Sequence, residues 1–222
     1  MKIELTNMGL LSLIFLILFA LSEILYHFFK VKVEYSRKLS HIGTGIICIL
    51  FPMLLKSHWS VLILCGLFAV LLLLSIKFNL LKSINSIDRK SAGSVCYPAA
   101  VYFCFLFATL LDRGYLFYYL PLIILAICDP LAALTGKKWP LGPFVIFGAK
   151  KTFLGSTIFF LGAILVGIII WGILYGFNSA ILQLPIVIAI AFFTTLAEAI
   201  SKDGYDNLTI PLSAILCLYI FH

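Results

Sequence analysis

The sequence predicts an all-α fold, a polytopic integral membrane bundle of about eight transmembrane helices with short loops and both termini outside (N-out/C-out). Of its 222 residues, 63% are hydrophobic and 11% are charged, whereas a soluble domain is about 45–50% apolar and about 25% charged. The apolar residues form continuous windows rather than the alternating pattern of lipid-facing barrel strands. This composition excludes a soluble enzyme, a disordered region and a nucleic-acid-binding domain, despite a net charge of +7.

Each predicted helix corresponds to one apolar window, and a helix needs roughly 20 such residues to cross the hydrocarbon core. Eight windows occur in chain order: 8–29, 41–55, 59–76, 92–111, 115–134, 153–177, 180–200 and 208–221. The second and last windows are the shortest, and at about 1.5 Å per residue they reach only about 21–23 Å. The first window is followed by basic residues and has no small-residue cleavage site, which predicts a retained helix rather than a signal peptide.

The basic residues support eight spans. If every window crosses, 13 of the 16 lysines and arginines lie on one side of the membrane and 3 on the other. Short cytoplasmic loops carry the excess of Lys and Arg, so the richer side is expected to be cytoplasmic, at the plasma (inner) membrane in a prokaryote. The loops leave no room for a second unit, so we expect residues 1–222 to form a single membrane-embedded catalytic domain. The six cysteines all fall inside windows and are expected to be packing residues.

Carboxylates at the cytoplasmic ends of two windows are the first candidates for chemistry. Asp129 lies near the end of the fifth window and Glu198 near the end of the seventh, with Asp206 and Asn207 soon after. Ionisable residues at membrane depth usually face a cavity or a partner, and Mg²⁺ takes oxygen ligands. Asp129, Glu198 and Asp206 are therefore predicted metal ligands. The alternatives are carboxylates paired with lysines and, for Asp206, a solvated turn.

The segment GAKKTFLGS, residues 148–156, has the composition of a phosphate cradle. Glycines allow backbone N–H groups to approach an anion, a helix N-terminus adds a favourable dipole, and lysines add positive charge. It is not a Walker A loop, which needs GxxxxGK[ST], and positive-inside topology explains its lysines equally well. The candidate phosphate-binding residues are Lys150, Lys151, Thr152, Gly155 and Ser156.

Two further segments open windows from the same side. RKLSH contributes Arg37, Lys38 and His41, which are either site residues or topology charges and an interface histidine. SAGSVCYP contributes Gly93 and Ser94, a pair suited to close backbone approach. All these polar groups therefore converge on one face of the predicted bundle.

Five segments in order, RKLSHIGTG, SAGSVCYP, CDPLAALTGKK, GAKKTFLGS and AEAISKDGYDNLTIP, carry a resemblance. Together they resemble the phytol kinase and dolichol kinase family of CTP-dependent polyprenol kinases, which is similar in turn to CTP-using diacylglycerol kinases and distantly to phosphatidate cytidylyltransferases. The resemblance implies transfer of the γ-phosphate of CTP to a membrane isoprenoid alcohol (phytol-, prenol- or dolichol-like), with Mg²⁺ or another divalent cation.

The resemblance also implies roles for individual residues. Catalytic roles fall on Asp129, Lys151, Glu198 and Asp206, and nucleotide binding on Gly136, Lys150, Lys151, Thr152, Gly155 and Ser156. Less defined roles fall on Arg37, Lys38, His41, Gly93, Ser94 and Asn207. One position departs from the family, because Leu154 stands where a Glu usually precedes Gly-Ser.

Two other functions stay open from the sequence. A phosphatidate cytidylyltransferase-like CDP-lipid synthase would use the same face, and a small membrane transporter would place Asp129 and Glu198 in broken helices at the bilayer midplane. The expected partners are a lipid alcohol, a nucleotide and the bilayer, without nucleic acid, and no obligate protein partner can be inferred.

Overall fold

The computed structural model of the chain describes residues 2–86, 91–110 and 114–221. Helices dominate these residues, with one two-stranded antiparallel sheet. The elements in chain order are α1 (Lys2–His27), α2 (Val33–Cys48), α3 (Phe51–Leu54), α4 (His58–Lys77), α5 (Lys82–Asn85), α6 (Gly93–Leu110), α7 (Leu116–Ile123), the π-helical turn η1 (Ile124–Cys128), α8 (Asp129–Lys138), β1 (Pro143–Ile146), β2 (Ala149–Thr152), α9 (Phe153–Tyr175), α10 (Phe177–Leu182), α11 (Leu184–Ile200) and α12 (Asp206–Phe221).

The predicted polytopic helical bundle is confirmed. Within the described residues, five helical stretches are long and apolar enough to cross a membrane, and α11 and α12 are shorter apolar helices. The five are Ile3–His27, His58–Lys77, Gly93–Leu110, Leu116–Lys138 and Phe153–Tyr175. The protein is therefore an integral membrane protein, and its elements correspond to the eight apolar windows of the sequence.

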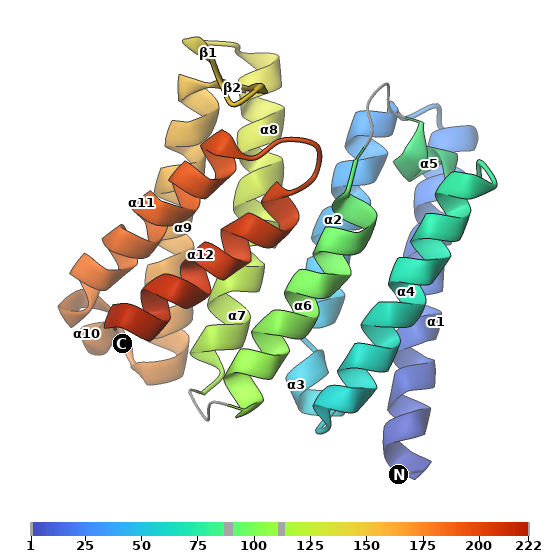
Figure 1. Cartoon of the computed structure of the whole chain (residues 1–222), viewed down its shortest axis with the longest axis horizontal. Helices are drawn as coiled ribbons and strands as arrows, with labels where there is room; N and C mark the ends of the chain where they lie inside the picture. The colour runs from blue at the N-terminus through green and yellow to red at the C-terminus, as the bar shows by residue number, and fades with distance from the viewer. Residues whose placement is uncertain (1, 87–90, 111–113, 222) are drawn as a thin grey trace.

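The helices run up and down between two ends (Figure 1). One end carries α5, the β-hairpin and the connection between α11 and α12, whereas α3, α10 and the N-terminus lie toward the other. The basic connections therefore gather at one end, as the distribution of lysines and arginines predicts. Arg89, Lys90 and Arg113, which also entered that prediction, lie outside the described residues, as does Leu111 at the end of the fourth window.

The helix that corresponds to the second window begins and ends at residues other than those predicted. The helix begins at Val33 rather than at residue 41, ends at Cys48, and is followed by the short helix α3. A hydropathy pattern assigns the charged residues near the start of this helix to a loop. Lys38 and its neighbours Ser36 and Ser40 are nevertheless buried, because this end of α2 is surrounded by protein rather than lipid. The seventh window is also divided, at Gln183, into α10 and α11.

The β-hairpin of β1 and β2 was not predicted from the sequence. Ile146 pairs with Ala149, so the turn consists of Phe147 and Gly148 alone. Their φ angles are +48° and +81°, and positive φ at both central residues is the requirement of a type I′ hairpin turn. The hairpin leads directly into α9, whose N-cap is Thr152.

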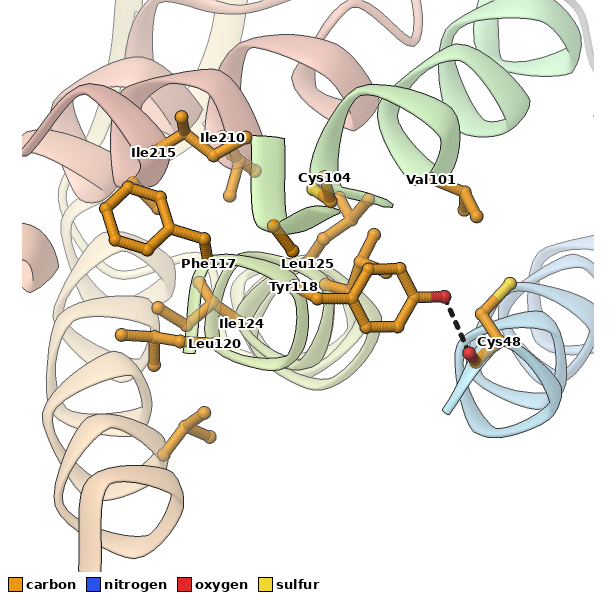
Figure 2. Close-up of a cluster of buried hydrophobic side chains, with 14 of the residues drawn as sticks. Cys48, Val101, Cys104, Phe117, Tyr118, Leu120, Ile124, Leu125, Ile210 and Ile215 are labelled. Atoms are coloured by element: carbon orange, nitrogen blue, oxygen red, sulfur yellow. Dashed lines mark hydrogen bonds between the residues drawn. The ribbon is translucent and has the colours of Figure 1, made fainter. Parts of the chain in front are cut away.

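The continuous stretch α7–η1–α8 is the centre of the bundle. Figure 2 shows Phe117 from this stretch beside Ile210 and Ile215 of α12, and Leu120 and Ile124 belong to the same buried cluster. On its other side, the Tyr118 hydroxyl donates a 2.6 Å hydrogen bond to the carbonyl of Cys48, the last residue of α2 (Figure 2). This bond satisfies a helix-end carbonyl that has no partner within its own helix. All six cysteines are described, buried and free, consistent with packing roles.

Helix α2 approaches η1 closely because residue 45 is glycine. A methyl group at position 45 would lie only 2.2 Å from the Cβ of Ala126, far inside van der Waals contact. Lys38, His41 and Gly45 share one face of α2 by their three- and four-residue spacing. The contact at Gly45 therefore sets how near Lys38 and His41 come to the residues that follow η1.

We expect Gly45→Ala to destabilise the protein by about 1–3 kcal/mol, the usual cost of overpacking a tight core. Adding Ala126→Gly should recover most of this loss because it removes the clashing methyl group. The measurement is thermal unfolding in detergent micelles. The matched control is Gly66→Ala on α4, where an added methyl group meets nothing within 4 Å. Equal melting temperatures for Gly45→Ala and wild type would show that the helices are not held at this contact.

Candidate active site

A buried ion pair joins α2 to the start of α8. Lys38 Nζ lies 2.7 Å from Asp129 Oδ2, and the two residues are only 7% and 4% exposed. His41, one turn further along α2, lies 3.8 Å from the same oxygen and donates from Nε2 to the Leu125 carbonyl at 3.1 Å. Buried charges need such partners because their desolvation is costly. The Asp129 carboxylate therefore has its charge balanced from α2, a helix distant in sequence.

The local backbone explains why Leu125 can receive the histidine. Pro130 has no N–H to donate, so the carbonyl five residues earlier in the π-helical register lacks its backbone partner. That carbonyl is Leu125, and His41 supplies the missing hydrogen bond. The π-helical turn and the proline thus give Asp129 a fixed position at the start of α8.

A second group of charges comes from the hairpin and from α11 and α12. Lys151 on β2 forms an ion pair with buried Glu198, and its Nζ lies 3.9 Å from Asp206 Oδ2. Side chains alternate along a strand, and neighbouring Lys150 is exposed. Glu198 Oε2 is buried and has no hydrogen-bond partner among the described residues. We call these residues, with the first pair, the lysine–carboxylate centre: Lys38, Asp129, Lys151, Glu198 and Asp206.

A polar pocket of about 500 Å³ opens beside this centre. Its lining comes from the first turns of α2, from α8, from the hairpin, from the start of α9 and from the connection between α11 and α12. The charged lining residues are Glu34, Arg37, Lys38, Asp129, Lys137, Lys150, Lys151, Glu198, Lys202, Asp203 and Asp206. Gly136, Thr152, Gly155 and Ser156 complete it on the α8–α9 side.

A second, apolar pocket of about 730 Å³ reaches the centre from inside the bundle. Helices α1, α2, α4 and α6 contribute its walls, largely with aromatic and aliphatic side chains such as Phe15, Phe19, Phe68 and Leu72. The two pockets share four lining residues, Arg37, Lys38, Asp129 and Asp206. A polar and an apolar compartment therefore meet at the lysine–carboxylate centre.

The structure brings the predicted site residues to one region. The residues predicted to bind nucleotide or catalyse line the polar pocket, and His41, Gly93, Ser94 and Asn207 line the apolar pocket. Arg37 and Lys38, whose roles were least defined from sequence, lie where the pockets meet. The chemical roles of all these residues stay predictions, but their convergence on one end of the bundle is a feature of the fold.

Two of the glycines predicted to bind nucleotide, Gly136 and Gly155, have packing and capping roles in this structure. A methyl group at Gly136 would lie 2.4 Å from Thr152 Oγ1, so Gly136 allows α8 to approach the start of α9. The Gly155 N–H donates to Thr152 Oγ1 at 3.1 Å, an N-cap bond, and is therefore not free for an anion here. The Ser156 hydroxyl, in contrast, is buried without a hydrogen-bond partner among the described residues.

Several lining residues were not singled out from the sequence. Glu34 binds Lys137 at 2.9 Å and lies 3.8 Å from Arg37, closing one side of the polar pocket. The spacing of Glu34 and Arg37, three residues apart, could have indicated a helix beginning before the second window. Lys137 and Lys202 were counted only as topology charges. Tyr97 donates its hydroxyl to the His41 carbonyl at 3.2 Å, a contact without a sequence signal.

The donor set fits a divalent cation that arrives with phosphate. Among the described residues, no three His, Cys, Asp or Glu side chains gather closely enough to hold a metal ion. The predicted ligands Asp129, Glu198 and Asp206 instead lie beside lysines. Mg²⁺ in phosphate-transferring sites is usually held by one or two carboxylates together with substrate oxygens and water, and the unpartnered Glu198 Oε2 suits that arrangement. The three-ligand site stays a prediction, and the lysine-paired alternative describes this structure.

Leu154, the position that departs from the family pattern, is not among the residues that line the two pockets. Thr152, Gly155 and Ser156 line the polar pocket, whereas Leu154 contributes to neither pocket as the described residues define them. Its backbone N–H donates to the Leu141 carbonyl at 3.4 Å.

These features define a class: a polytopic membrane protein with a charged centre between a polar pocket and an apolar one, suited to an enzyme that acts on a lipid. A phytol kinase from Synechocystis sp. is 30% identical over 190 residues, covering 82% of this chain and 77% of the relative. The chain belongs to the phytol kinase family, a family of lipid-alcohol kinases. No family model matches the chain, and the solved structures contain no significant match.

We expect Lys38→Met to destabilise the protein by about 3–5 kcal/mol, because it leaves the Asp129 carboxylate buried without its partner. The double variant Lys38→Met/Asp129→Asn should recover most of that stability, because no charge of the pair is then left buried without its partner. Thermal unfolding in detergent measures both. The control is Lys137→Met, whose side chain is 66% exposed in its pair with Glu34 and should cost about 0–1 kcal/mol. If the two lysine variants melt alike, the buried pair has no special role in stability.

Proposed function

We propose that the protein transfers the γ-phosphate of CTP to the hydroxyl of a membrane isoprenoid alcohol, at the cytoplasmic face of the membrane. The observation that carries the proposal is the junction of the two pockets at Arg37, Lys38, Asp129 and Asp206. A water-soluble phosphate donor and a lipid acceptor need compartments of opposite polarity that meet at the reacting atoms. Membership of the phytol kinase family supports the same reaction class.

In this proposal the polar pocket holds the triphosphate. The transition state of phosphoryl transfer spreads negative charge over phosphate oxygens, so catalysis depends on positioning and on cations. Lys151 and Lys150 on the hairpin and Arg37 on α2 surround the space with positive charge. The buried hydroxyl of Ser156 and the buried Nε of Arg37 have no partners among the described residues. Both are free to donate hydrogen bonds to phosphate oxygens.

The charge of the polar pocket supports a requirement for a divalent cation. Six basic and five acidic side chains of the described chain line the pocket, so its own charges nearly cancel. A triphosphate entering it brings a large excess of negative charge that the lysines already paired with carboxylates cannot neutralise. Glu198 and Asp206 or Asp129 are the carboxylates that would hold Mg²⁺, which would supply the missing positive charge.

The alcohol enters from the apolar pocket with its hydroxyl at the centre. Its oxygen forms a bond to the γ-phosphorus while the bond from that phosphorus to the bridging β–γ oxygen breaks, yielding an alkyl phosphate and CDP. Asp129, which lines both pockets, accepts the hydroxyl proton as general base and later releases it to water. Lys38 holds the carboxylate in place, and His41 fixes the backbone beside it.

The direct test supplies purified protein in micelles with Mg²⁺, a prenyl alcohol and CTP labelled in the γ-phosphate. We expect labelled alkyl phosphate as the product. Asp129→Asn should lower the rate at least tenfold because the base is lost, and Lys151→Ala at least tenfold because a phosphate-neutralising charge is lost. Lys82→Ala, an exposed lysine at the same end that lines neither pocket, should retain wild-type activity.

The same assay separates the rival reactions. With CTP labelled in the α-phosphate, label in the lipid together with release of pyrophosphate would identify a cytidylyltransferase instead. Wild-type activity in both Asp129→Asn and Lys151→Ala would contradict the site assignment while leaving the reaction class standing. Competition of unlabelled CTP, UTP, ATP and GTP against labelled CTP measures the nucleotide preference, which the resemblance assigns to CTP.

The cytoplasmic orientation can be tested with single cysteines. All six native cysteines are buried, so a membrane-impermeant thiol reagent added to intact cells should give little background. Lys82→Cys lies at the basic end of the bundle and Lys56→Cys at the other, and both parent residues are exposed. We expect Lys56→Cys to react in intact cells and Lys82→Cys only after lysis, because the basic end faces the cytoplasm. The reverse pattern would place the active face outside.

A further inference from the structure

The apolar pocket is long, and its length is set by two helices that flank it. Its lining on α2 extends from Arg37 to Cys48, and its lining on α4 from Ile76 to Leu64. At about 1.5 Å per residue, these stretches measure about 17 Å and about 18 Å. The helices run in opposite directions (Figure 1), so Lys38 and Ile76 lie toward the lysine–carboxylate centre, whereas Cys48 and Leu64 lie at the far end.

At the far end of this pocket, the lining stops on three segments of the chain. The lining stops at Phe15 on α1, at Phe51 on α3 and at Leu64 on α4. The next inward-facing residue on each of these segments is fully buried and outside the pocket lining: Leu11, Leu55 and Val61. Phe15 and Phe51 meet edge to face with ring centroids 6.2 Å apart. Solid core therefore lies beneath an aromatic floor, which we define as Phe15, Phe51 and Leu64.

The depth of the pocket corresponds to a definite hydrocarbon length. An extended chain advances about 3.5 Å for every three bonds, so an isoprene unit with four backbone bonds spans about 4.7 Å on the same geometry. A pocket about 18 Å deep therefore accepts about four isoprene units in extended form. That is the length of geranylgeraniol or phytol, and much shorter than dolichol.

We propose that the aromatic floor limits the length of the acceptor's hydrocarbon chain, so that the enzyme phosphorylates alcohols of up to four isoprene units and rejects longer ones. Phe51 is the specificity-determining residue. This inference rests on the proposed function, because it assumes that the pocket holds the acceptor chain with its hydroxyl at Asp129. Phe51 is decisive because it begins α3 directly below the end of α2 and is the more deeply buried of the two phenylalanines, at 1% exposed against 4% for Phe15. A longer chain would have to displace it into the packed core.

The test compares kcat/KM for farnesol, geranylgeraniol, geranylfarnesol and solanesol, with γ-labelled CTP. For wild type we expect the value to peak at geranylgeraniol and to fall at least tenfold at geranylfarnesol. Phe51→Ala and the milder Phe51→Leu should raise the ratio of geranylfarnesol to geranylgeraniol at least fivefold, and Phe51→Trp should move the peak to farnesol. These are ratios within one preparation, so loss of folded protein does not change them.

The matched control is Phe192→Ala, an exposed phenylalanine on α11 that lines neither pocket, and its profile should equal that of wild type. A wild-type enzyme that uses solanesol as well as geranylgeraniol, or an unchanged profile in Phe51→Ala and Phe51→Leu, would overturn the inference. Absence of γ-phosphate on every alcohol would instead refute the proposed function.

A binding experiment tests the floor without turnover. A geranylgeraniol analogue with a diazirine at its hydrocarbon end is irradiated with the wild-type protein, and the labelled peptide is identified by mass spectrometry. We expect label on Phe51, Leu64 or Phe15. Label confined to lipid-facing residues of α9 or α11 would show that the chain lies outside the pocket and would overturn the inference even for an active kinase.

Discussion

The need to pair buried charges is the constraint on which this structure depends. A lysine or carboxylate at membrane depth is tolerated only beside a partner or in a cavity, and Asp129 meets that condition through Lys38, 2.7 Å away on another helix. The pair can form because Gly45 lets α2 approach η1 within van der Waals contact of Ala126. One packing detail thus brings α2, the central helix and the charge of the site into a single arrangement.

The same constraint explains what could and could not be predicted from the sequence. The sidedness of lysines and arginines predicts that Asp129, Lys151, Glu198 and Asp206 share one end, because topology alone decides it. That these carboxylates also lie beside Lys38 and Lys151 depends on side-chain geometry that spacing does not contain.

The two other differences have equally specific causes. The start of α2 at Val33 was not predicted because a hydropathy pattern assigns a charged residue such as Lys38 to a loop. Hydropathy does not indicate that this lysine is buried within the protein. The hairpin was missed because its strands are only four residues long and its turn is Phe147–Gly148 rather than a typical Asn-Gly pair. Glycine raised a different ambiguity, since Gly136 and Gly155 fit phosphate approach and tight helix packing equally well until the contacts with Thr152 are known.

The position of the lysine–carboxylate centre between two pockets of different polarity is what suits it to a chemical role. A paired lysine and carboxylate in a uniformly apolar core would be a structural feature of modest net value. Here the pair lies where a pocket lined by basic and acidic side chains meets one lined by aromatic and aliphatic side chains. In the proposed reaction its charges would therefore face both a polyanion and an oil-soluble alcohol. A phosphoryl group can pass between two solvents that do not mix only at such a boundary. The lysine on the α2 side therefore serves two functions at once, stabilising the fold and holding the carboxylate at the point where the phases meet.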